Sequence, residues 1–183
     1  MPYMPYILNS LLIVLEILGL VKLGRFQWKM FAFYTQLSNV IALLSAILFL
    51  ATQGAPAAVY VRYVATCMMV MTALSTFAIL VPLGGGIKPL MLSGFGLYVH
   101  TLCPIVCAVS YIVWEPHVDV WWLPMGISVF YGVLMMVLNG LGKADGPYPF
   151  FRVHNQSARA TALWIVVLAV LVGGISFGIA ALA

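Results

Sequence analysis

Long apolar segments alternate with short polar breaks along the whole chain. A helix needs about 20 mostly apolar residues to cross a bilayer. The segments that meet this requirement are residues 6–23, 30–51, 59–81, 94–114, 120–141 and 161–182. The breaks between them carry glycine, proline or charged residues, which interrupt helices. The pattern therefore predicts an all-α fold in which residues 1–183 form a single domain, a bundle of six transmembrane helices.

The composition is that of a membrane protein. Hydrophobic residues make up 64% of the chain and charged residues 7%, and the mean hydropathy is +1.13. Soluble domains are about half apolar and about a quarter charged. We expect an integral, multi-pass protein surrounded by membrane lipids, in the cell membrane if the host is prokaryotic. The net charge of +4 belongs to residues in and beside short loops, so no nucleic-acid partner is expected.

Basic residues are distributed unevenly between the two sides of the predicted bundle. The first, third and fifth loops with their flanks hold Lys22, Arg25, Lys29, Lys88, Lys143, Arg152 and Arg159. The opposite side holds Arg62 alone. Because cytoplasmic loops are enriched in Lys and Arg, both termini are predicted on the non-cytoplasmic side. Glu115 and Asp119 are expected on that outer side, within a belt of tryptophans.

A polar cluster, FAFYTQLSN, lies near the start of the second predicted span. Thr35, Ser38 and Asn39 are spaced i, i+3 and i+4, so they share one face of a helix. Thr35 is about five residues into its span, which corresponds to a depth of about 8 Å. His100 is about six residues into the fourth span on the same side, or about 9 Å deep. The two side chains are therefore expected at matching depth.

Other polar groups are predicted near this level. Pro104 cannot donate a hydrogen bond to the carbonyl of residue 100, so a kink is expected beside His100. Glu16 is an acid inside the first span, and ionisable residues within a membrane are functional candidates. Tyr148 belongs to the loop GPYPFF, which is expected at the same face and close enough to fold back among the helices.

Several chemistries can be compared for these residues. His100 is the one histidine within a span, which disfavours a haem held by paired histidines. A zinc site from His100, Cys103 and Cys107 lacks an evident fourth ligand. Cys103 as a nucleophile is disfavoured because a thiol in apolar surroundings is inert. With Cys67, these cysteines lie in hydrophobic runs and are expected to be buried thiols rather than a disulfide framework.

Nucleophilic catalysis by threonine fits the polar residues better. A threonine hydroxyl needs a base to remove its proton, and His100 is placed for that task. Ser38 or Asn39, one turn deeper, are candidate donors to a developing oxyanion. Glu16 or Tyr148 are both candidates to orient the imidazole, and the sequence leaves that choice open.

Three short blocks resemble a known family. They are FYTQLSNVIALL at residues 33–44, YVHTLCPIV at 98–106 and GPYPFF at 146–151. In order and spacing they resemble the androgen-induced, FAR-17a-like six-span membrane proteins, most closely the prokaryotic branch often labelled Pr6Pr. Characterised animal members are threonine hydrolases that cleave fatty acid esters of hydroxy fatty acids. The resemblance implies that Thr35 and His100 correspond to the catalytic threonine and histidine of those proteins.

The sequence thus predicts an intramembrane hydrolase of lipid metabolism. A lipid or fatty-acyl ester would be the substrate, Thr35 the nucleophile and His100 the general base, with no cofactor or metal. Ser38, Asn39, Glu16 and Tyr148 would support the site or bind substrate. The alternative is a non-catalytic lipid-binding or transport protein that uses the same polar pocket. Polar groups continuing to the outer face would favour transport, and Asn9 is the main one evident there.

Overall fold

The structure, a computed structural model, describes residues 3–24, 27–145 and 148–182. Six helices in this part of the chain are long and apolar enough to cross a membrane. The first two are α1 (Met4–Leu23) and α2 (Tyr34–Ala51). The third span is Pro56–Gly85, in which α3 (Pro56–Ser75) continues as the π-helical segment η2 (Thr76–Gly85).

The fourth span, Gly94–Trp114, is built from three consecutive segments. These are α4 (Gly94–Leu97), the π-helical turn η4 (Tyr98–Leu102) and α5 (Cys103–Trp114). The last two spans are α6 (Trp122–Gly140) and α7 (Ala158–Leu182). Short helices occupy the connections, namely η1 (Trp28–Ala32), η3 (Lys88–Leu92), η5 (Pro149–Phe151) and η6 (Val153–Asn155). All six predicted spans are therefore confirmed as helices.

The second span begins later than predicted. Residues Trp28–Ala32 form a 3-10 helix and Phe33 is extended, so Thr35 is the second residue of α2 rather than the sixth of its span. Side chains replace the missing main-chain bonds at this break. The Tyr131 hydroxyl donates to the Ala32 carbonyl at 2.6 Å, and the Thr35 amide donates to the Tyr148 hydroxyl at 3.2 Å. Tertiary contacts thus set where α2 starts.

The third span runs past its predicted end at residue 81. Proline interrupts α-helical hydrogen bonding, yet the chain continues through Pro82 in the wider π-helical form. It turns at Gly84, whose φ of 102° favours glycine. The expected loop is therefore shorter and partly helical, because η3 begins at Lys88.

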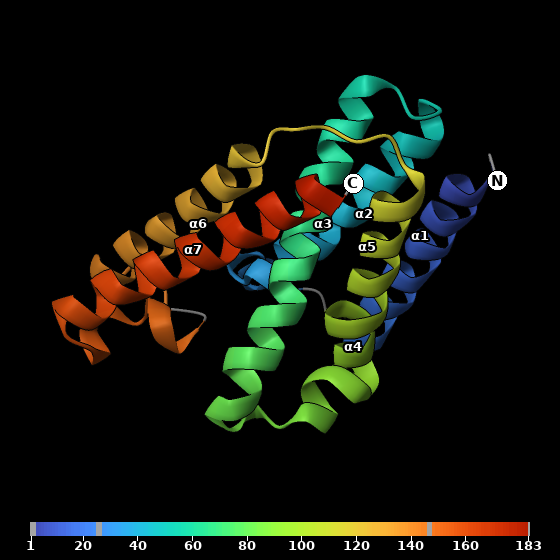
Figure 1. The fold of residues 1–183 in the computed structure, drawn as a ribbon. Coiled ribbons are helices and arrows are strands. Elements are labelled where there is room, and N and C mark those ends of the chain that lie inside the picture. The colour runs from blue at the N-terminus through green and yellow to red at the C-terminus, as the bar shows by residue number, and fades with distance from the viewer. Residues whose placement is uncertain (1–2, 25–26, 146–147, 183) are drawn as a thin grey trace.

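The spans pack as two groups joined by α3 (Figure 1). Helices α1, α2, α3 and α5 pack around small residues such as Ala42, Ala46, Ala65 and Cys103. Helices α6 and α7 lie side by side and pack against α3 through a second core rich in methionine and aromatic residues. Large apolar side chains face outward from all six spans, as a lipid environment requires.

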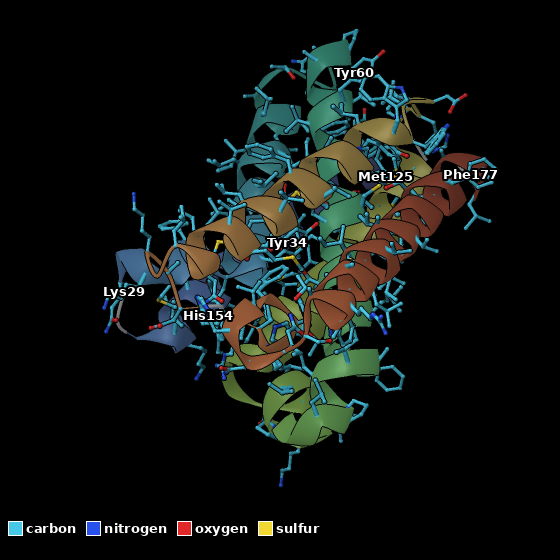
Figure 2. The ribbon with its side chains drawn as sticks, turned by 90° about the vertical axis from the view of Figure 1, so that its left-hand side faces the viewer. Lys29, Tyr34, Tyr60, Met125, His154 and Phe177 are labelled. Atoms are coloured by element: carbon cyan, nitrogen blue, oxygen red, sulfur yellow. The ribbon has the colours of Figure 1, made fainter. Side chains whose placement is uncertain are left out.

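The start of α1 and the end of α7 lie at the same end of the bundle, here called the termini end. The Tyr6 hydroxyl near the start of α1 contacts the Gln53 carbonyl just after α2, and Ile179 near the end of α7 packs with Tyr63 and Tyr111. The opposite end, the loop end, holds η1, η3, η5 and η6. Lys29 and His154 lie toward it and Tyr60 lies far from them (Figure 2). Which end faces the cytoplasm stays a prediction.

The loop after α6 folds back into the bundle, as predicted. Tyr148, Phe150 and Phe151 are all buried in the core between α3, α6 and α7. Gly146 and Pro147, which belong to the same sequence block, lie outside the described residues, as does Arg25 of the basic cluster. The aromatic part of the loop therefore reaches the level of Thr35.

Candidate active site

The side chains of Thr35 and His100 meet in the structure. Thr35 Oγ1 lies 3.3 Å from His100 Nε2. Thr35 comes from the first turn of α2 and His100 from the π-helical turn η4, just before Pro104. The two side chains are 8% and 9% exposed, so the contact is screened from bulk solvent. Wide helical turns of this kind often occur at functional sites.

A main-chain carbonyl determines which nitrogen of His100 carries the proton. His100 Nδ1 lies 2.6 Å from the Leu90 carbonyl oxygen. A carbonyl can only accept a hydrogen bond, so Nδ1 must be the donor. In the neutral ring Nε2 then has a free lone pair, and the Thr35 hydroxyl donates to it. The imidazole is therefore held in the tautomer in which Nε2 can act as a base.

This carbonyl, rather than a carboxylate, holds the imidazole. The sequence left Glu16 and Tyr148 as the candidates, and among the described residues neither is hydrogen-bonded to His100. A main-chain group on η3 could not be inferred from side-chain spacing. Gly96 marks the close approach, because a Cβ there would lie 2.4 Å from the Leu90 carbonyl oxygen. The Thr101 hydroxyl fixes the same segment by donating to the Met91 carbonyl at 2.7 Å.

Tyr148 contacts Thr35 at two atoms. Its hydroxyl accepts the Thr35 amide at 3.2 Å and lies 3.3 Å from Thr35 Oγ1. Its ring stacks on Phe150 with 5.2 Å between centroids. Burial raises the pKa of the Tyr148 phenol, so the hydroxyl keeps its proton at neutral pH. Because the Tyr148 oxygen accepts the Thr35 amide hydrogen, the proton of the Tyr148 hydroxyl can be donated to another oxygen of the site.

Ser38 and Asn39 have a different task from the one predicted. Ser38 Oγ and Asn39 Nδ2 both donate to the Thr35 carbonyl, at 3.0 and 2.7 Å. Ser38 Oγ also lies 2.8 Å from Thr72 Oγ1, and Asn39 Nδ2 lies 3.4 Å from the Val99 carbonyl. Their donors are engaged, so neither is free for an oxyanion. They hold the first turn of α2 instead.

Glu16 lies on α1 and does not hydrogen-bond the imidazole of His100. Its carboxyl group is 2% exposed and contacts the Cys103 thiol. Its Oε1 atom has no hydrogen-bond partner. Glu16 and Asn39 instead line a small cavity between α1, α2 and α4, here called the Glu16 cavity.

A larger, apolar cavity lies on the other side of Thr35. Its empty volume is about 690 Å³, counted to its open side. Thr35 and Tyr148 form part of its wall, and the rest is mostly apolar, including Met71, Phe151 and Val172. Helices α3, α6 and α7 and the segment η2 enclose it. The Thr35–His100 pair thus lies beside a space that suits an acyl chain.

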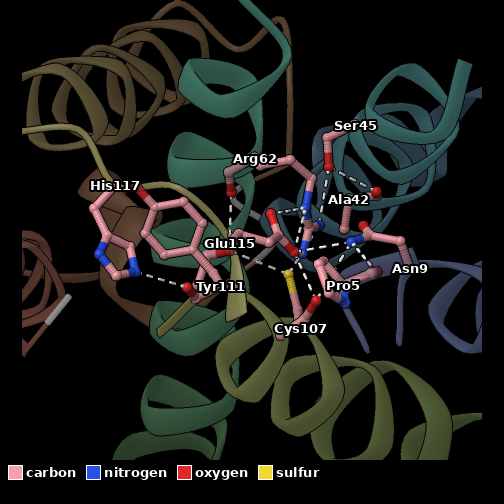
Figure 3. A network of polar contacts seen from close by, with 11 residues as sticks. Pro5, Asn9, Ala42, Ser45, Arg62, Cys107, Tyr111, Glu115 and His117 are labelled. Carbon is pink, nitrogen blue, oxygen red and sulfur yellow. Dashed lines mark hydrogen bonds and ion pairs between the residues drawn. The ribbon is translucent and has the colours of Figure 1, made fainter. Parts of the chain in front are cut away.

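The sequence analysis missed a second polar cluster, at the termini end (Figure 3). Arg62 is fully buried in α3 and forms an ion pair with the buried Glu115 at 2.9 Å. Asn9 Nδ2 and Ser110 Oγ donate to the same carboxylate at 2.9 and 2.6 Å, and Arg62 Nη1 donates to Ser45 Oγ at 3.2 Å. Arg62 within α3 and Glu115, the first residue after α5, are therefore both buried in the bundle. The signal was present, since Arg62 lies inside the predicted span 59–81 and a buried charge needs a partner.

The cysteines match their prediction. Cys67, Cys103 and Cys107 are free and buried. Within the described ranges, no group of three or more His, Cys, Asp or Glu side chains is arranged to hold a metal ion. Cys107 contacts Arg62 Nη1 at 3.4 Å and so belongs to the cluster at the termini end.

No family model matches the chain, and neither a curated protein nor a solved structure matches it.

Proposed function

We propose that the chain is an intramembrane threonine hydrolase that cleaves a lipid ester, of the kind in which a fatty acid esterifies a hydroxy fatty acid. The proposal includes membership of the androgen-induced, FAR-17a-like family that the sequence blocks resemble. The observation that carries it is the contact of Thr35 Oγ1 with the acceptor nitrogen of His100. A hydroxyl beside an oriented base is the arrangement that activates a threonine nucleophile.

The reaction uses these two side chains in turn. His100 Nε2 takes the Thr35 hydroxyl proton while Oγ1 attacks the acyl carbonyl carbon. The proton then passes from Nε2 to the leaving alkoxide, which departs as the alcohol product. Water, deprotonated by the same nitrogen, attacks the Thr35 ester and releases the fatty acid. The proton returns to Oγ1, so no metal or cofactor is needed.

Tyr148 is the group best placed to stabilise the oxyanion. Its hydroxyl keeps its proton, lies 3.3 Å from Thr35 Oγ1 and lines the apolar cavity. A donor aimed at the developing negative charge lowers the barrier more than one aimed at the ground state. We assign this role to Tyr148 instead of Ser38 or Asn39, because Ser38 Oγ and Asn39 Nδ2 donate to the Thr35 carbonyl.

The apolar cavity would receive the acyl chain. Its wall of methionine, phenylalanine and valine offers no charge to a polar ligand. Binding sites for small lipophilic ligands are typically apolar with a few polar groups at one point. Thr35 and Tyr148 are among the polar groups of this wall, together with hydroxyls such as those of Thr72 and Ser128. An acyl chain that fills the cavity would have its ester carbonyl beside the nucleophile.

A non-catalytic lipid-binding or transport protein is the second candidate. The observation in its favour is the polar cluster of Arg62 and Glu115 at the termini end, since a transport path needs polar groups in both halves of the membrane. However, the guanidinium is engaged by Glu115, Ser45 and Cys107. A charge fully paired in this way is better suited to holding helices together than to passing a ligand.

A fluorophosphonate probe tests the hydrolase proposal on purified protein. We expect covalent labelling at Thr35, lost in Thr35→Ala and strongly slowed in His100→Ala. Thr52→Ala, a change of the exposed threonine at the other end of α2, serves as the matched control and should label normally. Cys103→Ala should also label normally, because the thiol contacts Glu16 and not the proposed nucleophile.

Two results would contradict the proposal. One is a wild-type protein that is never labelled and never releases fatty acid from any ester. The other is Thr35→Ala protein that labels as fast as the wild type. In either case, uptake of a labelled lipid by vesicles containing the protein would decide whether the second candidate holds.

A further inference from the structure

The Glu16 cavity holds two oxygen atoms that lack a partner. Glu16 Oε1 and Asn39 Oδ1 are both buried and unpaired, and the two side chains line the same cavity. The assignment of the Asn39 amide is forced, because its nitrogen faces the carbonyls of Thr35 and Val99. Leaving a buried polar atom unpaired costs about 1–3 kcal/mol. Two such atoms on side chains that line one cavity indicate that something occupies it.

The occupant must be small and must donate a hydrogen bond. The space open to the centre of a water molecule is about 10 Å³, and one buried water needs about 10–15 Å³ by that measure. Besides Glu16 and Asn39, the lining includes Gln36 and the apolar side chains of Leu20, Phe95 and Val99. Gln36 lies in the first turn of α2 and adds a further polar side chain to the wall. These features fit one water molecule.

We propose that the Glu16 cavity is a water site and that it supplies the water for hydrolysis of acyl-Thr35, an inference that rests on the proposed function. The bound water donates to Asn39 Oδ1 and pairs with Glu16 Oε1. Asn39 contacts both the cavity and the residue that carries the nucleophile, since it lines the cavity and its Nδ2 donates to the Thr35 main-chain carbonyl at 2.7 Å. Thr35 thus has apolar space on one side of α2 and a wet site on the other.

This arrangement solves a problem particular to an ester hydrolase within a membrane. The acyl chain needs an apolar space that excludes water, whereas release of the acyl group consumes one water per turnover. Two separate cavities meet both needs. The balance is that one water hydrogen passes to His100 Nε2 and then to Thr35 Oγ1, and the hydroxyl remains on the fatty acid.

Radiolytic hydroxyl-radical labelling tests the water site without any assay of activity. Radicals form from bound water and oxidise the side chains beside it, which mass spectrometry identifies. Val99 lines the cavity and is 2% exposed, and Val59 is an equally buried valine at 3% exposure outside it. We expect Val99 to be oxidised several times faster than Val59. Equal rates would overturn the site.

The substitution Glu16→Met tests the residue that holds the water. Methionine is unbranched and of similar length but cannot pair with water, so the labelling of Val99 should fall to that of Val59. Ile17→Met is the matched control, because Ile17 is the next residue and is 48% exposed. Unchanged Val99 labelling in Glu16→Met would contradict the assignment of Glu16.

Burst kinetics with a chromogenic fatty-acid ester test the role of the water. In Glu16→Met the burst that reports acylation of Thr35 should persist, while steady-state turnover falls about tenfold, equal to about 1.4 kcal/mol. A burst and a turnover that fall together would show a general loss of structure and overturn the supply role. A wild type that never releases fatty acid from the ester refutes the hydrolase and the supply role together, whereas the labelling of Val99 still decides the water site.

Discussion

At the scale of single residues, Gly96 allows the Leu90 carbonyl to reach His100 and so determines which nitrogen of the imidazole carries the proton. A Cβ at position 96 would lie 2.4 Å from the Leu90 oxygen and 2.6 Å from the Pro89 oxygen. Both are main-chain atoms, which cannot rotate away as the end of a side chain can. The substitution must therefore move η3 away from η4, and the Leu90–His100 bond is the first contact to be lost.

We predict that Gly96→Ala frees His100 to adopt either tautomer. The ¹⁵N shifts of the ring nitrogens should change from a single Nδ1–H form to a mixture, and probe labelling of Thr35 should slow about tenfold or more. Gly126→Ala is the control, because a Cβ there meets nothing within 4 Å. An unchanged tautomer in Gly96→Ala would show that the Leu90 carbonyl does not hold the ring.

Tyr148→Phe removes one oxygen and keeps the packed ring. The Thr35 amide then loses its acceptor, and an orphaned buried donor costs about 1–3 kcal/mol of folding free energy. We expect a lower melting temperature and slower probe labelling.

In the wild type, the raised pKa of Tyr148 keeps the donor protonated above pH 10, the normal tyrosine value. A labelling rate that falls through pH 9–10 by titration of this phenol would contradict that role.

At the scale of elements, tyrosine hydroxyls set the start of α2. Tyr131 reaches from α6 to the Ala32 carbonyl, an oxygen that a longer α2 would use within the helix. The break between η1 and α2 puts Thr35 in a first turn, where main-chain amides lack partners within the helix. The Thr35 amide is therefore free to bond Tyr148. The position of the nucleophile thus depends on residues about 100 positions later in the chain.

We predict that Tyr131→Phe weakens the break before α2. Loss of this bond should cost about 1–3 kcal/mol and raise hydrogen exchange in the first turn of α2, measured by mass spectrometry on peptides that contain Thr35. Tyr60→Phe, a change of an exposed tyrosine at the termini end, should leave exchange as it is (Figure 2). Equal exchange in the two variants would mean that the hydrogen bond from Tyr131 to the Ala32 carbonyl does not set the start of α2.

At the scale of the whole molecule, the cluster of Arg62 and Glu115 joins four spans. Arg62 on α3 contacts Ser45 on α2, and Glu115 at the end of α5 accepts from Asn9 on α1. Removing one member of a buried ion pair leaves the other charge uncompensated, which typically costs about 3–5 kcal/mol. Replacing both by apolar residues costs much less.

We therefore predict that Arg62→Met lowers the melting temperature in detergent strongly and that Arg62→Met with Glu115→Leu recovers most of the loss. Asp119→Asn removes an exposed acid from the same end and should change the melting temperature little. A double variant at least as unstable as the single one would mean that the cluster does more than hold the spans together. Vesicle uptake of lipid by the double variant would then be the relevant measurement.

The sequence by itself determined the six spans, because a segment of about 20 apolar residues can cross lipid as a helix that satisfies its own main-chain hydrogen bonds. It also paired Thr35 with His100, since helical rise converts position in a span into depth. That pairing was right, since Thr35 Oγ1 lies 3.3 Å from His100 Nε2, although Thr35 lies nearer the start of its helix than expected.

Only the tertiary structure decided what each polar residue contacts. The Leu90 carbonyl at His100, the Thr35 carbonyl at Ser38 and Asn39, and the two unpaired oxygens of the Glu16 cavity involve main-chain atoms or empty space. A main-chain atom or an empty space has no residue type that a sequence pattern can reveal. Side-chain spacing along one helix gives a face and a depth, whereas a hydrogen bond also needs the direction and distance of its partner, and these come from the packing of other helices.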